Sequence, residues 1–202
     1  MSTNNTQVPS RQEAILLALA GLLETDPGSK ITTANLARAV GVTEAALYRH
    51  FPSKRKMFEG LIDFAEEAVF SRCQQILNEQ GDARVRLSQL TSLMLVFADR
   101  NPGLCRVLTG EALTGEDDVL RRRASQFFER LETQLRQVIK EGEIRQGLRV
   151  GTSSTRAAAW LMVFVEGRIQ RFVRSTFKHR PAQDFDESWA LLTATLWSDQ
   201  PG

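Results

Sequence analysis

Residues 31–58 constrain the fold more than any other part of the chain. They read as two short helices around Gly41, followed by the start of a longer third helix. Thr32 or Thr33 can cap the first of these helices and Thr43 the second, while Gly41 suits the left-handed turn between them. This spacing predicts a helix-turn-helix, a motif that places its second helix in the major groove of DNA.

The charge of this segment differs from that of the rest of the chain. Residues 30–58 carry six cations and one acid, Glu44, which sum to +5, whereas the whole chain has a net charge of +2. The remaining residues therefore sum to −3. A basic head on a mildly acidic body favours binding of a polyanion by the head, although a merely solvated face is the alternative. The six cations are Lys30, Arg38, Arg49, Lys54, Arg55 and Lys56.

The second short helix has the side chains expected of a helix that reads DNA. Two consecutive alanines leave the outward side of this helix without bulky side chains, so that its backbone can approach base edges. Polar side chains follow at its C-terminal end and are suited to contact phosphates. A cation then begins the next helix, where free backbone N–H groups already favour an anion. The threonines serve equally well as caps alone, and the tyrosine as a partly buried residue. The predicted DNA-binding residues are Thr32, Thr33, Thr43, Ala45, Ala46, Tyr48, Arg49, His50 and Lys54.

The rest of the chain has the apolar periodicity of helices, and no segment alternates as a strand would. We therefore predict an all-α fold. We expect a disordered segment over 1–9, a helix-turn-helix head over 10–56, and a helical domain for partner binding and dimerisation over 57–199. A turn is predicted at 26–29, and helices at about 10–24, 53–79, 82–100, 104–108, from 117 or 118 onward, 154–177 and 184–197.

The last two predicted helices are apolar around much of their circumference. A surface helix needs only one apolar stripe, so a second buried face is expected there. We predict a homodimer through a helical bundle, and a monomeric core is the alternative. The predicted interface residues are Trp160, Phe164, Arg168, Phe172, Trp189, Leu192 and Leu196.

The sequence carries no signature of an enzyme or of a cofactor site. It contains no Gly-rich phosphate loop and no Ser–His–Asp set, and its two histidines, His50 and His179, are far apart in the chain. Cys73 and Cys105 lack metal-site spacing and are predicted to be buried thiols of a reducing compartment. No signal peptide and no apolar run of membrane-spanning length are present, so we expect a cytoplasmic protein.

The head resembles that of the TetR family of DNA-binding proteins. The resemblance rests on the Gly41–Val42–Thr43 turn and on Leu47–Tyr48 followed by His50–Phe51 and Ser53–Lys54. It implies a dimer whose two heads read the half-sites of a near-palindrome. Whether dimers assemble further on DNA is left open by the sequence. A ligand-responsive repressor, with Trp160 and Phe164 lining a small-molecule pocket, is one function that the family allows.

The body resembles a particular branch of this family, which acts in nucleoid occlusion. The matching stretches are 100–110, 128–138 and 171–186. The resemblance implies a nucleoid-associated protein that, once on chromosomal sites, binds the tubulin-like division protein FtsZ and antagonises its polymers. Val96 departs from it, because glycine is expected there. The implied partner residues are Phe64, Arg72, Leu93, Arg100 and Asn101, although periodicity alone favours solvated arginines and a buried Phe64 and Leu93.

Overall fold

The computed structural model describes residues 10–25, 31–79, 81–115 and 118–197. Over these residues the chain forms nine α-helices and one 3-10 turn, and its only β-type pairing is an isolated bridge between Val150 and Trp197. The prediction of an all-α fold is confirmed. The disorder expected for 1–9 and the turn expected at 26–29 lie outside the described residues.

The helices begin and end within about three residues of the predicted positions. The head contains α1, α2 and α3, and the body contains the others. Their bounds are α1 Arg11–Thr25, α2 Thr33–Val40, α3 Glu44–His50, α4 Lys54–Asn78, α5 Ala83–Arg100, α6 Pro102–Leu108, the 3-10 turn η1 Glu111–Leu113, α7 Asp118–Gln146, α8 Ser154–Arg174 and α9 Phe185–Leu196.

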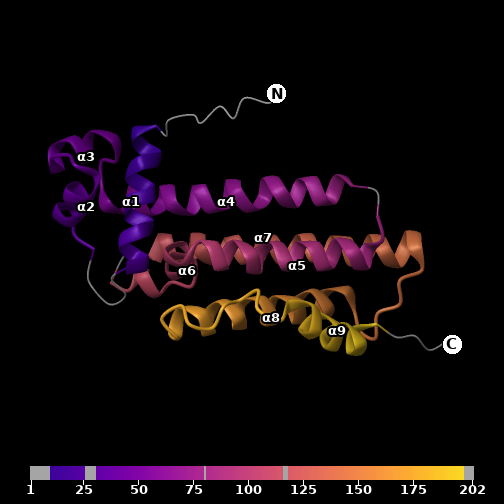
Figure 1. Cartoon of the computed structure of the whole chain (residues 1–202). Coiled ribbons are helices and arrows are strands. Elements are labelled where there is room, and N and C mark those ends of the chain that lie inside the picture. Colours follow the sequence, from indigo (N-terminus) through magenta and orange to yellow (C-terminus); the bar gives the residue numbers. More distant parts are fainter. Residues whose placement is uncertain (1–9, 26–30, 80, 116–117, 198–202) are drawn as a thin grey trace, which may run out of the picture.

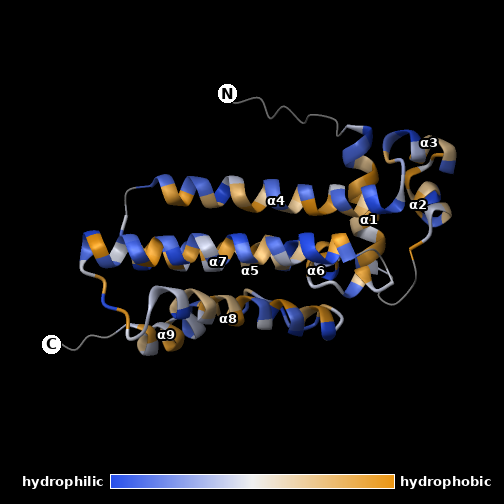
Figure 2. Ribbon diagram, turned by 180° about the vertical axis from the view of Figure 1, so that it is seen from behind, coloured by the Kyte–Doolittle hydropathy of each residue, from blue (hydrophilic) through white to orange (hydrophobic). Residues whose placement is uncertain are grey.

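The body is a stack of long helices with the head at one end (Figure 1). The helix α4 forms one edge of the stack, α5 and α7 lie at the middle level, and α8 and α9 form the opposite edge. The helix α1 crosses between the head and the body. Hydrophobic residues recur along all these helices, and α9 carries them at the edge away from α4 (Figure 2). None of the described helices is both long and apolar enough to cross a bilayer.

Local signals explain where the body helices start. The Ser53 hydroxyl accepts a hydrogen bond from the backbone N–H of Lys56 at 3.2 Å, which caps α4. The Asp82 carboxylate accepts a hydrogen bond from the backbone N–H of Arg84 at 2.6 Å, which caps α5. Pro102 at the start of α6 lacks the N–H that a first helical residue leaves unpaired, so it costs no hydrogen bond there.

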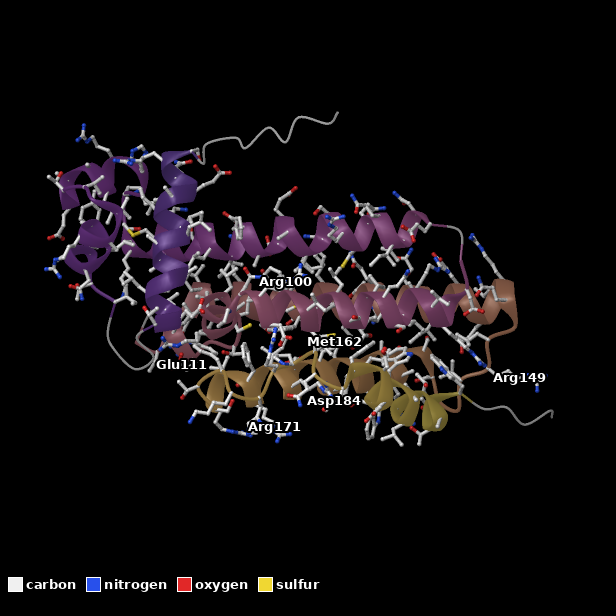
Figure 3. The ribbon with its side chains drawn as sticks, viewed as in Figure 1. Arg100, Glu111, Arg149, Met162, Arg171 and Asp184 are labelled. Atoms are coloured by element: carbon white, nitrogen blue, oxygen red, sulfur yellow. The ribbon has the colours of Figure 1, made fainter. Side chains whose placement is uncertain are left out.

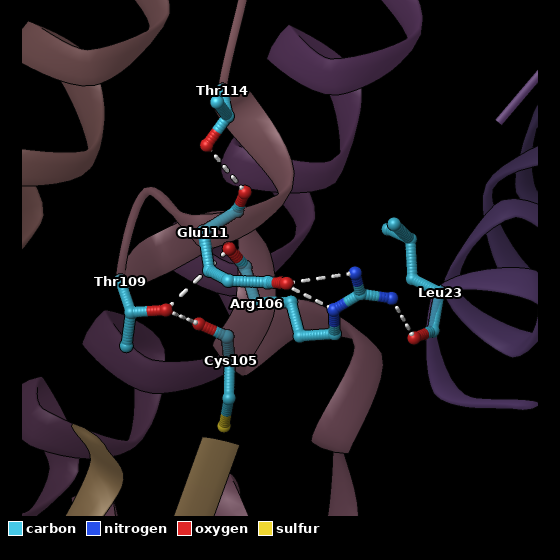
Figure 4. Close-up of polar contacts among 6 residues, drawn as sticks. All are labelled: Leu23, Cys105, Arg106, Thr109, Glu111 and Thr114. Atoms are coloured by element: carbon cyan, nitrogen blue, oxygen red, sulfur yellow. Dashed lines mark hydrogen bonds and ion pairs between the residues drawn. The ribbon is translucent and has the colours of Figure 1, made fainter. Parts of the chain in front are cut away.

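Head and body are joined by close packing of α6 on α1. A Cβ atom on Gly103 would lie only 2.1 Å from the backbone oxygen of Ala20, so only glycine fits this approach. The buried Arg106 donates to the backbone oxygen of Leu23 at 2.6 Å and also pairs with the Glu111 carboxylate (Figure 4). The predicted domain boundary at residues 56–57 falls inside α4, and one apolar core continues through head and body.

Both cysteines are buried free thiols, as predicted. Burial raises the pKa of Cys73 from 9.0 to about 11, and burial also raises the pKa of Cys105. The thiolate is the reactive form, so a pKa two units higher lowers its population about a hundredfold. We expect the native protein to react with a disulfide reagent at pH 8 about a hundredfold more slowly than after denaturation. Fast labelling of two thiols in the native state would contradict this burial.

Candidate nucleic-acid interface and partner surfaces

The helix-turn-helix is built by two threonine caps and one glycine. The Thr32 hydroxyl accepts a hydrogen bond from the backbone N–H of Asn35 at 3.2 Å, and Thr43 accepts one from Ala46 at the same distance. Gly41 adopts φ 72°, ψ 39° and so turns the chain from α2 into α3. The sequence left Thr32 and Thr33 as alternative caps for α2, and the structure assigns that role to Thr32.

A small apolar core fixes the orientation of α3. Leu36 and Ala37 of α2 are buried, as are Leu47 of α3 and Phe51 directly after it. These four side chains turn the opposite side of α3 outward. That outward side carries Ala45, which is exposed, as the sequence predicts.

None of the nine predicted DNA-binding residues is buried. Thr32, Thr43, Ala45, Arg49 and His50 are exposed, as is Tyr48 at 43%. The remaining three, Thr33, Ala46 and Lys54, are half-buried.

The hydroxyl of Thr33 has a partner that the sequence did not indicate. It donates to the Glu44 carboxylate at 2.6 Å and thereby links the start of α2 to the start of α3. A hydroxyl has one proton, so Thr33 cannot donate to a phosphate while this bond is present. The hydroxyl of Thr33, one of the predicted DNA-binding residues, is therefore not available to donate to DNA in this conformation.

The start of α4 adds cations beside α3. Lys54 lies at the first helical position, with its Nζ 5.5 Å from the ring centroid of Phe58. Arg55 and Lys56 both pair with Glu59, at 3.3 and 2.5 Å. These ion pairs neutralise part of the positive charge counted from residues 30–58 alone. Lys54, at the first position of α4, is the residue of this cluster that the sequence predicts to contact DNA.

We expect Tyr48→Ala to weaken DNA binding by about 1–3 kcal/mol, because its exposed phenol loses a phosphate contact. Tyrosine is neutral, so the salt dependence of binding should stay unchanged, whereas Lys54→Ala should reduce its slope by about one. Fluorescence anisotropy over a salt series measures both quantities. Val85→Ala, which truncates an exposed side chain of α5, is the control and should bind as wild type. Unchanged affinity of Tyr48→Ala would remove Tyr48 from the interface.

The α4 part of the predicted partner surface is exposed. Phe64 is 39% exposed, and Arg72 is exposed and donates to Gln75 at 3.0 Å. The other flank of α4 faces α7, where Arg123 bonds both Asp63 at 2.8 Å and Glu66 at 2.9 Å. Helical geometry therefore places Phe64 and Arg72 on the flank away from α7, about 12 Å apart along the axis.

The α5 part of this surface lies along the neighbouring antiparallel helix. Arg100 is exposed at the end of α5, and in Figure 3 it lies at the level of α4 and α5. The Asn101 amide donates to the Phe97 backbone oxygen at 2.7 Å and so closes the end of α5. Leu93 is half-buried and packs on the core. Leu93 and Asn101 therefore also have structural roles.

The residues of the predicted dimer interface differ in how much of their surface is exposed. Trp160 is 64% exposed, and Phe164, Trp189 and Leu192 are half-buried. Phe172, by contrast, is only 2% exposed and Leu196 only 7%, so both belong mainly to the core of one protomer. The sequence could not distinguish these two from the surface residues, because both helices are apolar on more than one side.

Arg168 is bonded to other parts of its own chain. Its guanidinium donates to the backbone oxygens of Pro181 and Gln183 at 2.7 Å each, and also to the Ser188 hydroxyl. It also stacks over the Phe164 ring at 4.8 Å. Arg168 therefore ties the α8–α9 connection to α8.

Two hollows flank α8. An apolar groove of about 740 Å³ between α8 and α9 is lined by Trp160 and Leu191, among others. A smaller pocket of about 290 Å³ lies between α6, α7 and α8 and is lined by Glu129, Glu132 and Glu166. Burial raises the pKa of Glu166, and the nearby charge of Glu132 raises it further. Trp160, which the repressor alternative places in a small-molecule pocket, lines the open groove between α8 and α9 and is 64% exposed.

Several residues that were not among the predicted site residues belong to the surfaces described above. Val163 and Leu191 are 68% and 75% exposed and extend the apolar surface around Trp160. Val163 stands three residues after Trp160, so helical spacing was the available signal. In the sequence, Glu44 entered only into the net charge of residues 30–58, and its contact with Thr33 was not predicted. Among the described residues, no group of three His, Cys, Asp or Glu side chains is placed to hold a metal ion.

Comparisons with protein families cover both parts of the chain. Residues 15–61 match the family described as bacterial regulatory proteins, tetR family, and residues 81–197 match the SlmA-like family, described as tetracyclin repressor-like, C-terminal domain. Among solved structures, the chain resembles FadR from Bacillus subtilis in complex with stearoyl-CoA, with a TM-score of 0.77 and 15% identity, covering 91% of this chain and 98% of that one. MbdR from Azoarcus sp. CIB also has a TM-score of 0.77, at 18% identity, covering 94% and 100%. At these identities the likeness concerns the fold.

Curated relatives are much more similar in sequence. The nucleoid occlusion factor SlmA of Marinobacter nauticus is 71% identical over 191 residues, which cover 95% of this chain and 98% of that protein. The SlmA protein of Vibrio vulnificus is 53% identical over 188 residues, covering 93% and 96%. Together with the helix-turn-helix head and the matching C-terminal region, these similarities show that the chain belongs to the SlmA family of TetR-type proteins.

Proposed function

We propose that this protein is a nucleoid occlusion factor: a homodimer that binds near-palindromic chromosomal sites through its heads and antagonises FtsZ assembly through the α4–α5 surface. The observation that carries the proposal is the 71% identity to a nucleoid occlusion factor along almost the whole of both chains. The exposed helix-turn-helix supports DNA binding, and the exposed Phe64, Arg72 and Arg100 support a partner surface on the body.

The DNA-binding part of the proposal follows from the head. The outward side of α3 carries only a small side chain at Ala45 and polar side chains from Tyr48 to His50. This allows α3 to enter a major groove while its C-terminal end contacts phosphates. Two heads in a symmetric dimer then read two half-sites about one helical turn of DNA, or a multiple of it, apart. We propose 10–56 as the DNA-binding domain, with 57–199 for the partner and the dimer.

The chemistry of the α4–α5 surface favours an acidic partner with an apolar anchor. Arg72 on α4 and Arg100 at the end of α5 supply two exposed guanidinium groups, and Phe64 on α4 is also exposed. An extended acidic segment of FtsZ can pair with the arginines and bury an apolar side chain against Phe64.

Co-sedimentation of FtsZ polymers tests the whole proposal. The full-length protein is mixed with FtsZ and GTP, either without DNA or with a duplex selected by the protein from a random pool. We expect the protein to bind FtsZ and to reduce the pelleted polymer, most strongly with the selected duplex. Equal polymer in all samples, together with DNA binding that responds to a small molecule, would instead indicate an ordinary repressor.

We expect Trp160→Asp to weaken dimerisation by about 3 kcal/mol or more, because a charge would replace an exposed aromatic anchor of the α8–α9 surface. Sedimentation velocity over a dilution series measures the dissociation constant, and DNA affinity should fall with it. Ile144→Asp is the control, since Ile144 is 83% exposed but lies on α7. An unchanged dimer in Trp160→Asp would place the interface elsewhere.

A ligand-responsive repressor is the second candidate, and the pocket between α6, α7 and α8 is the observation in its favour. Three glutamates and Arg121 are among the residues that line this pocket, and this excess of acidic groups suits a cation better than an acyl-CoA such as the one bound to the B. subtilis FadR. Measuring DNA binding with and without stearoyl-CoA decides the matter for that ligand class. We expect no change in affinity.

A further inference from the structure

Glu44 stands out in the head because it is an acid within a surface assigned to a polyanion. It is the only acid among residues 30–58, and it occupies the first position of the reading helix α3. Its side chain is exposed. The N-terminal residues of a reading helix are those that contact base edges in helix-turn-helix proteins. A carboxylate at this position is therefore placed near bases.

A neighbouring helix holds this carboxylate in place. The Thr33 hydroxyl at the start of α2 donates to Oε2 of Glu44 at 2.6 Å. A carboxylate can accept several hydrogen bonds, so Glu44 can accept another donor while keeping this one. A hydrogen bond from a second helix restricts the rotamers of a long side chain, and this lowers the entropy cost of using it in recognition.

The major groove offers few donors that a carboxylate can accept. Guanine and thymine present acceptors there, cytosine presents its N4 amino group, and adenine presents an N6 amino group beside the N7 acceptor. A carboxylate that approaches adenine therefore meets a repelling acceptor next to the donor. Only cytosine offers an amino group to Glu44 without this repulsion.

We propose that Glu44 is a specificity-determining residue that accepts a hydrogen bond from the N4 amino group of a cytosine in each half-site, and that Thr33 is its positioning residue. This inference rests on the proposed DNA-binding function. It also accounts for the engaged Thr33 hydroxyl, because Thr33 acts on the DNA through Glu44 and not through a phosphate.

Selection from a random duplex pool tests the inference with the full-length protein. The wild type, Glu44→Ala and Glu44→Gln are each used to select 24-base-pair duplexes, and the selected pools are sequenced. We expect one position in each half-site where the wild type prefers cytosine about tenfold, and where Glu44→Ala has no preference. Glu44→Gln should change that preference to adenine, since an amide matches the N6 and N7 pair.

Thr33→Val tests the positioning role. It removes the hydroxyl but keeps the shape, and we expect cytosine preference to fall about threefold while affinity for random DNA is retained. In a Glu44→Ala background the same change should leave base preference unaltered, because the group that Thr33 orients is gone. An equal loss of affinity for every sequence would instead indicate that Thr33 contacts phosphate.

The outcomes separate this inference from the proposed function. If the wild type selects no sequence, sequence-specific DNA binding itself is wrong. If the wild type selects a motif and all the Glu44 variants select the same motif, Glu44 only stabilises the start of α3 and the inference is overturned. If Glu44→Ala fails to fold, as judged by circular dichroism, the near-isosteric Glu44→Gln decides by its adenine preference.

Discussion

Gly103→Ala is expected to lower the free energy of unfolding by about 3 kcal/mol, at the upper end of the cost of overpacking. The added Cβ would lie 2.1 Å from the backbone oxygen of Ala20 and 2.9 Å from its carbonyl carbon, so it meets backbone and not a flexible side chain. To relieve the contact, α6 must move away from α1. DNA affinity should fall as well, because α1 holds α2 and α3 on the body.

The matched control for this variant is Gly21→Ala. Gly21 is the residue after Ala20 in α1, but a Cβ there meets nothing within 4 Å. Alanine is the better helix former, so this change should raise the free energy of unfolding by about 0.5–1 kcal/mol. Urea denaturation at equal protein concentration measures both variants, since a dimer's stability depends on concentration. Equal stability of Gly103→Ala and wild type would mean that the α1–α6 approach is looser than the structure describes.

Arg100→Asp is expected to weaken FtsZ binding about thirtyfold or more while DNA binding stays unchanged. The arginine is exposed at the end of α5, and reversing its charge opposes an acidic segment at the proposed contact. Arg72→Asp should act in the same way from α4. Co-sedimentation with FtsZ polymers measures the first property, and anisotropy with a selected duplex measures the second.

The control for Arg100→Asp makes the same charge change at another exposed arginine. Arg122 is exposed near the start of α7, a helix that contacts the other flank of α4. Arg122→Asp should therefore retain FtsZ binding. If both variants lose it, the effect is one of net charge and not of the α4–α5 surface. If Arg100→Asp loses DNA binding too, the change has disturbed α6 and the head rather than a partner contact.

The sequence predicted the helices well because their signals are local. A cap such as Thr43 bonds a backbone group three residues later, and Gly41 supplies its own left-handed conformation, so neither depends on distant parts of the chain. The placement of the DNA-binding surface followed from the same signals. The residues that face outward on α3 are those left over once Leu47 is assigned to the core.

The sequence predicted the exposure of the α8 and α9 residues less well because its signals there are ambiguous. The helix α8 is apolar on several sides, and nothing in its periodicity tells Phe172, which is buried, from Trp160, which is exposed. Arg168 was assigned to a partner, although its bonds go to the α8–α9 connection of the same chain. These distinctions depend on which neighbour covers which face, and that is decided by packing.

The sequence by itself thus determined an all-α chain with a basic helix-turn-helix, since charge, periodicity and caps are properties of adjacent residues. Only the tertiary structure decided that Thr33 holds Glu44 and that Gly103 rests on Ala20. These contacts join residues 11 and 83 positions apart in the chain. Contacts of this kind form only once the helices have packed, because their geometry is fixed by the relative position of whole helices and not by local conformation.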